Sequence, residues 1–134
     1  MQNRTRATGH IEVTSYVPVP YDVVDGSPSL NELHVTEFFK GDIDGQGTAR
    51  MLQVALDPAS ASFCAVERVT GTLAGRSGTF VLQDEGTLTG TRVSGRWFVV
   101  PGSATGDLRG LRGEGSFEAE LGQHASYVLD YWFE

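Results

Sequence analysis

Short runs of apolar, aromatic and β-branched residues, separated by glycine and proline, make up the pattern along this chain. Within these runs apolar and polar residues alternate, as where Phe117, Ala119 and Leu121 flank Glu118 and Glu120. No stretch shows the 3.6-residue apolar period of an amphipathic helix. The pattern predicts strands over residues 8–16, 32–40, 48–56, 63–74, 79–87, 92–100, 114–121 and 125–133.

These strands predict an all-β fold, a closed eight-stranded antiparallel barrel with a central cavity. The 134 residues have the length of one domain, so we expect a single β-barrel domain over residues 1–134. Residues 17–29 contain Pro18, Pro20 and Pro28, which cannot donate hydrogen bonds to a sheet. We therefore expect a long ordered loop there, placed as a lid over one end.

The central hairpins assign side chains to the two faces of the sheet. A tight turn centred on Arg76 and Ser77 sets Leu73 opposite Phe80, and this register leaves one face polar. A one-residue slip would turn the whole apolar set outward, which favours this register. We expect the following side chains to point outward: Arg68, Gln83, Glu85 and Arg96.

The opposite, apolar face carries the candidate ligand-binding residues. A second turn, at Thr89 and Gly90, sets Trp97 opposite Leu82. The interior of an eight-stranded barrel is packed solid or holds one small ligand, and both remain open. Buried tyrosines favour a cavity, because a phenol needs a hydrogen-bond partner. The residues expected to line it are Val69, Phe80, Leu82, Trp97, Phe117, Tyr127 and Tyr131.

Two carboxylates fall on this apolar face, Glu67 and, diagonally across from it, Asp84. We expect them at one mouth of the barrel, near Gly86. Partial desolvation and mutual repulsion there would raise the pKa of at least one of them into the range of general acid or base catalysis. They are the candidate catalytic residues. The alternative is that both lie solvated and inert at a wet rim.

Three segments resemble a bacterial family of small proteins of unknown function whose fold is similar to the allene oxide cyclase barrel. They are residues 71–83 (GTLAGRSGTFVLQ), 97–103 (WFVVPGS) and 106–115 (GDLRGLRGEG), followed by Leu129, Asp130 and Tyr131. The resemblance implies a dirigent-like barrel with a cavity, and no mechanism. The chain departs from the pattern at Asp84, where a histidine is expected, and at Ala104, where a glycine is usual.

Charge and composition limit the partners. The formal charge of −7 disfavours nucleic acid and anionic membranes, and no apolar run is long enough to span a bilayer. One cysteine and no targeting pattern predict a cytoplasmic protein, with Cys64 as a buried structural thiol. An outer apolar patch of Val81, Phe98 and Val100 predicts a homodimer or homotrimer.

We expect no metal and no cofactor, because the three histidines, His10, His34 and His124, lie far apart in the sequence. Two functions remain. In one, the protein is a cofactor-independent cyclase or isomerase acting on an apolar, oxygenated metabolite of polyketide or lipid type. In the other, it is a non-catalytic carrier or sensor of a small ligand.

Overall fold

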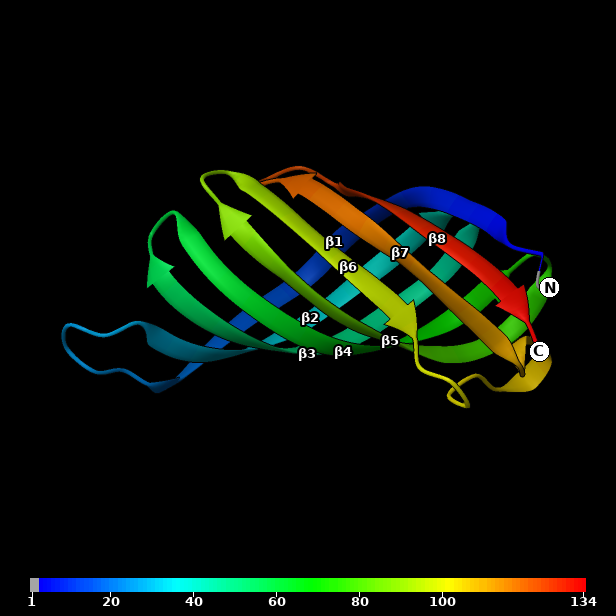
Figure 1. The fold of residues 1–134 in the computed structure, drawn as a ribbon, viewed down its shortest axis with the longest axis horizontal. Helices are drawn as coiled ribbons and strands as arrows, with labels where there is room; N and C mark the ends of the chain where they lie inside the picture. Colours follow the sequence, from blue (N-terminus) through cyan, green and yellow to red (C-terminus); the bar gives the residue numbers. More distant parts are fainter. Residues whose placement is uncertain (1–2) are drawn as a thin grey trace.

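The computed structural model describes residues 3–134 and contains a closed barrel of eight antiparallel strands (Figure 1). Strands that are consecutive in the sequence pair with each other, and β8 pairs with β1 to close the sheet. The predicted all-β barrel is confirmed. The strands are β1 (Thr5–Asp22), β2 (Ser29–Gly41), β3 (Ile43–Asp57), β4 (Ser60–Leu73), β5 (Arg76–Thr89), β6 (Arg92–Val99), β7 (Leu111–Glu120) and β8 (Ala125–Phe133).

Helical structure is confined to one short 3-10 turn, η1 (Gly106–Leu108), among the residues that the structure describes. Leu108 of this turn is fully buried and joins the core at one end of the barrel. The connection before it follows the start of β5, where Thr79 and Thr105 exchange backbone and side-chain hydrogen bonds. Over residues 3–134 no helix is long and apolar enough to cross a membrane.

The segment predicted as a loop, residues 17–29, is mostly strand. β1 continues to Asp22 and pairs with β2 through Pro18 and Pro20, so only residues 23–28 connect the two strands. The prolines are tolerated because β8 pairs with β1 only as far as Ile11, which leaves the other edge of β1 free beyond that point. The resulting hairpin projects beyond its neighbours as an arm (Figure 1).

The turn between β4 and β5 lies two residues before the predicted one. Its central residues are Ala74 and Gly75, whose φ angles of 54° and 75° suit a type I′ turn. Val69 therefore faces Phe80, where the sequence had placed Leu73. Because the partners shift by an even number of residues, every side chain keeps its predicted face.

The turn between β5 and β6 is also displaced, to Gly90 and Thr91, so Trp97 faces Asp84 and not Leu82. The predicted faces are again retained. Val69, Leu82 and Trp97 are buried, whereas the side chains predicted to point outward are exposed: Arg68, Gln83, Glu85 and Arg96.

The interior of the barrel is packed with large apolar side chains. The rings of Phe39, Trp97, Phe117 and Tyr127 lie 5.0–6.1 Å from one another as successive neighbours. A glycine makes room for one of them, since a Cβ on Gly95 would come within 2.3 Å of the Phe117 ring.

Leu82 tests this packing, because its side chain is fully buried whereas that of Leu56 is 55% exposed. We expect Leu82→Ala to lower the free energy of unfolding by about 2–5 kcal/mol through lost burial and a residual cavity. Leu56→Ala, the matched control, should change it by less than about 1 kcal/mol. Denaturant unfolding of both variants measures the difference, and equal losses would contradict the inward placement of Leu82.

Candidate functional site

Glu67 and Asp84 both point into the barrel, as predicted. Glu67 is 1% exposed and is the buried charged residue of the core, facing Leu82 of β5 across the β4–β5 ladder. Asp84 faces Ala65, so the two acids are diagonal neighbours. Their predicted position at the barrel mouth is wrong, because both lie near the middle of their strands, where Glu67 is buried and Asp84 is half-buried.

A third carboxylate, which the sequence reasoning missed, belongs to the same cluster. Glu37 of β2 pairs with Gly47 of β3, and Gly47 pairs with Val69 of β4. A Cβ on Gly47 would lie 2.2 Å from Oε2 of Glu67, so the missing side chain leaves the space in which the Glu67 carboxyl lies. The alternation of β2, with buried Leu33, Val35 and Phe39, was the available signal for Glu37.

Two carboxyl oxygens of this cluster lack the hydrogen bonds that buried polar atoms usually have. Among the described residues, Oε2 of Glu67 and Oδ1 of Asp84 are buried and have no hydrogen-bond partner. A buried polar oxygen without a partner loses its hydration and gains nothing in return, at a cost of about 1–3 kcal/mol. Such atoms in a native fold therefore require an explanation, and a ligand or a proton provides one.

Burial and crowding favour the protonated forms of these acids. The pKa of Glu67 is raised well above its usual range, first by desolvation, then by the adjacent Glu37 side chain and the charge of Asp84. The pKa of Asp84 is raised to about 7, first by desolvation and then by the charge of Glu37. At neutral pH the cluster therefore combines a protonated acid with a carboxyl group that titrates.

Aromatic side chains border the acids on one side. Trp97 lies directly across the β5–β6 ladder from Asp84, and its indole nitrogen donates a 3.1 Å hydrogen bond to the Val128 carbonyl. Tyr127 uses its hydroxyl differently from our expectation: it accepts from the Ile43 N–H and donates to the Lys40 carbonyl, both at 3.0 Å. The phenol thus ties β8 to the β2–β3 turn and needs no ligand as a partner.

The predicted ligand-lining residues lie together in the core. Five are buried and two are half-buried against the same cluster; the buried set is Val69, Phe80, Leu82, Trp97 and Tyr127, and the half-buried set is Phe117 and Tyr131. They belong to one core cluster inside the barrel. Their contact with a ligand stays a prediction.

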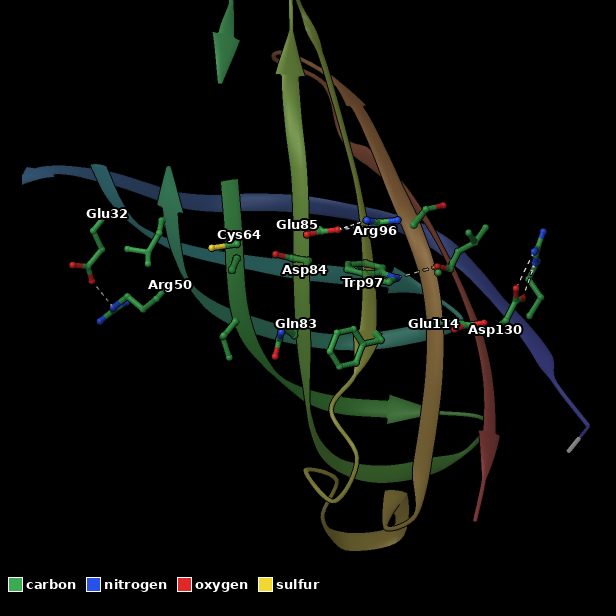
Figure 2. Close-up of a pocket in the computed structure, with 18 residues that line it drawn as sticks. Glu32, Arg50, Cys64, Gln83, Asp84, Glu85, Arg96, Trp97, Glu114 and Asp130 are labelled. Carbon is green, nitrogen blue, oxygen red and sulfur yellow. Dashed lines mark hydrogen bonds and ion pairs between the residues drawn. The ribbon is translucent and has the colours of Figure 1, made fainter. Parts of the chain in front are cut away.

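A hollow of about 1170 Å³ lies along the outer face of the barrel, and Asp84 and Trp97 are among the residues that border it (Figure 2). Three exposed apolar side chains, Leu52, Val66 and Phe98, line it. Charged pairs surround them, and the shortest contacts in three of these pairs are Arg96–Glu85 at 2.5 Å, Arg6–Asp130 at 2.8 Å and Arg50–Glu32 at 3.7 Å. The sequence reasoning had no signal for this hollow, because it follows from the curvature of the sheet.

A family profile described as a protein of unknown function, DUF3224, matches residues 7–131. The chain belongs to the DUF3224 family. A solved structure, of a DUF3224 protein with unknown function from Shewanella oneidensis MR-1, is 31% identical with a TM-score of 0.79 and covers 98% of both chains. The search of curated proteins finds no match.

The expected membership in a family of unknown function is therefore confirmed for this DUF3224 protein. Its likeness to the allene oxide cyclase barrel stays an expectation. The expected burial of Cys64 is wrong. Cys64 is exposed on the outer face of β4, because the alternation of that strand turns it away from the core. His10 and His124, remote in sequence, lie with their rings 5.5 Å apart, because barrel closure joins β1 to the start of β8.

The raised pKa of Asp84 gives the DUF3224 protein a pH-dependent stability. The folded state prefers protonated Asp84, so this contribution is complete below pH 4 or so and is lost as the pH rises through about 7. A rise from 3.8 to about 7 corresponds to on the order of 4 kcal/mol at alkaline pH. Glu67 acts in the same direction.

We therefore expect Asp84→Asn, which cannot ionise, to lose less stability than wild type between about pH 5 and pH 8. Denaturant unfolding at several pH values measures this slope. Glu118→Gln, at an exposed carboxylate of β7, is the control and should keep the wild-type slope. Identical slopes for wild type and Asp84→Asn would contradict the burial of Asp84.

Proposed function

We propose that the protein binds an apolar, oxygenated small molecule inside the barrel and moves a proton on it, as a cofactor-independent isomerase or cyclase. The observation that carries this proposal is the pair of buried, unpartnered oxygens on Glu67 and Asp84 within an apolar interior. Carboxyl groups are costly to keep in such a place, and perturbed acids of this kind concentrate at functional sites.

The two acids suit different roles. Asp84, with a pKa of about 7, is ionised in part of the molecules near neutrality, where a general base is most effective. Glu67, held protonated by burial, is suited to donate a hydrogen bond or a proton to an oxygen of the substrate. Glu37 keeps Glu67 protonated through its adjacent side chain and its charge. Proton transfer of this kind requires no metal or organic cofactor.

The apolar surroundings define the substrate class. Val69, Leu82 and Trp97 lie on the same inward face as the acids and offer apolar contacts. A polyketide- or lipid-derived molecule with a carbonyl, hydroxyl or epoxide oxygen would match apolar walls and a single polar cluster. The allene oxide cyclase-like barrel expected from the sequence belongs to this proposal, as does a cytoplasmic location, which agrees with the exposed thiol of Cys64.

A carrier or sensor without catalysis is the second candidate, and the outer hollow favours it. The hollow offers about 1170 Å³ beside Leu52, Val66 and Phe98, enough for a drug-sized ligand. No carboxyl in a carrier needs to change its protonation state. Because Asp84 also borders the hollow, the two candidates are distinguished by whether Asp84 must change its protonation state.

The proton-transfer proposal is tested with 5-nitrobenzisoxazole, a small aromatic molecule that opens when a base removes its one acidic C–H proton. We expect wild type to accelerate this reaction with a rate that rises through about pH 7, as Asp84 ionises. Asp84→Asn should lower kcat/KM by about 100-fold or more, the usual contribution of a positioned base. Glu67→Gln keeps a hydrogen-bond donor and should lose less.

Glu114→Gln, at an exposed carboxylate of β7, is the matched control and should keep the wild-type rate. Reaction at the buffer rate with wild type, or equal rates in wild type and Asp84→Asn, would refute the acid–base roles. Binding of the uncharged fluorophore N-phenyl-1-naphthylamine without any turnover, sensitive to Phe98→Glu but not to Asp84→Asn, would replace the enzyme with the carrier.

We also propose that the protein forms a homodimer or homotrimer through its outer face. Of the predicted patch, Phe98 is exposed and Val81 and Val100 are half-buried, while the exposed Leu52 and Val66 extend it. The surrounding charges occur in both signs, so the face is complementary to a second copy of itself.

Light scattering at micromolar concentration should give two or three times the 14.4 kDa chain mass. Phe98→Glu should lower it to the monomer value by placing an unpaired charge in the contact. Thr72→Glu, at an exposed position of β4, is the control and should leave the mass unchanged. A monomer mass for wild type would contradict this association.

A further inference from the structure

Three metal-ligating side chains meet on the outside of the barrel, at the seam between β1 and β8. His10 and Glu12 are two residues apart on β1 and so share its outer face. The β1–β8 ladder pairs His10 with Ser126 and Ile11 with Ala125, and its continuation brings His124 beside Glu12. One ligand atom from each of His10, Glu12 and His124 can be chosen so that all lie within 4.8 Å of one another.

The ligand atoms of these groups lie near coordination distance. Nε2 of His124 lies 3.6 Å from Oε1 of Glu12. Ligand atoms that share one tetrahedral zinc lie about 3.3 Å apart, given bonds of about 2.0–2.1 Å. The two imidazole rings are stacked, with an interplanar angle of 7° and centroids 5.5 Å apart. Because the nitrogen lone pairs lie in the ring planes, one exposed ring must turn for both histidines to bind a single ion.

The neighbouring charges are mixed. Lys40 pairs with His10 across the β1–β2 ladder, and its ammonium lies 5.4 Å from the centre of the ring of Phe38, which pairs with Glu12, so one positive charge borders the site. Glu118 of β7, which pairs with Ser126 of β8, is bound by Arg92. With a formal charge of −7 on the chain, the general field also attracts cations.

We propose that His10, Glu12 and His124 form a binding site for a divalent transition-metal ion, zinc above all. Two imidazoles and one carboxylate are the donors that zinc and its neighbours prefer, whereas calcium and magnesium require oxygen ligands. Three protein ligands leave a coordination position for water or an anion. The proposal is independent of the acids inside the barrel, since the site lies on the opposite face of the sheet.

A metal ion at this site would cross-link two segments at the end of the β1–β8 ladder. The β1–β8 ladder ends at the pair Ile11–Ala125, and β1 then continues alone with β2 as the projecting arm. Coordination by Glu12 and His124 would add a cross-link directly beyond that last pair. The ion would thus join the β7–β8 turn to the base of the arm, and binding would raise the stability of the closed barrel.

Isothermal titration of the full chain, with any purification tag removed, tests the site with zinc chloride. We expect one zinc ion per chain, and at least tenfold weaker binding in His10→Ala and in His124→Ala. Glu12→Gln should weaken binding in the same direction. His34→Ala is the matched control, because His34 is the remaining histidine and pairs with Glu32, away from the proposed site. The zinc affinity of this variant should stay within twofold of wild type.

Two further measurements make the outcome unambiguous. Zinc should raise the melting temperature of wild type and His34→Ala but not of His10→Ala, and magnesium should raise neither. Cobalt(II) should give a visible absorption band that disappears in His124→Ala. All the altered side chains are exposed or half-buried, so circular dichroism should show an unchanged fold. Absence of zinc binding in wild type, or equal loss in His34→Ala, would overturn the proposal.

Discussion

The limited cross-section of a closed eight-stranded barrel is the constraint on which the rest of this structure depends. Side chains of neighbouring strands share this limited space, and at two positions a glycine makes room for a large side chain. Phe117 lies over Gly95, and the Glu67 carboxyl lies over Gly47. The glycines of this chain are thus as important for what fills the interior as for its turns, and they determine where a carboxyl group can be placed.

That constraint explains the chemistry of the acid cluster. Glu67, Asp84 and Glu37 come from three strands, and their common inward face leaves no water-exposed alternative for Glu67. Trp97 and Tyr127 belong to the apolar core cluster, and Trp97 faces Asp84, so the acids border an apolar environment. In such surroundings a proton is the simplest means of neutralising a carboxylate, which is why the pKa values of Glu67 and Asp84 rise.

The outer surface of the barrel differs from the interior in the side chains that it carries. Exposed apolar residues there lie among ion pairs, and the histidine–glutamate cluster lies where the ladder between the first and last strands stops. Both features depend on barrel closure, since His10 and His124 are separated by most of the chain. The same sheet therefore presents carboxyl groups inside and the histidine–glutamate cluster outside, separated by one layer of backbone.

The sequence by itself determined the strands and their faces, because the two-residue period of a strand is a local property. The inward positions of Glu67 and Asp84 followed from that period, even though both hairpin turns were misplaced by an even shift in pairing. The same argument failed for the arm, because the sequence analysis interpreted its prolines as a loop although a free strand edge accepts them.

Tertiary structure alone decided which distant residues meet. Glu37 reached the acids through the register of β2, β3 and β4, His124 met His10 through closure, and the phenol of Tyr127 found backbone partners across the barrel. Each of these contacts joins segments distant in the chain, and no local pattern encodes the distance between them.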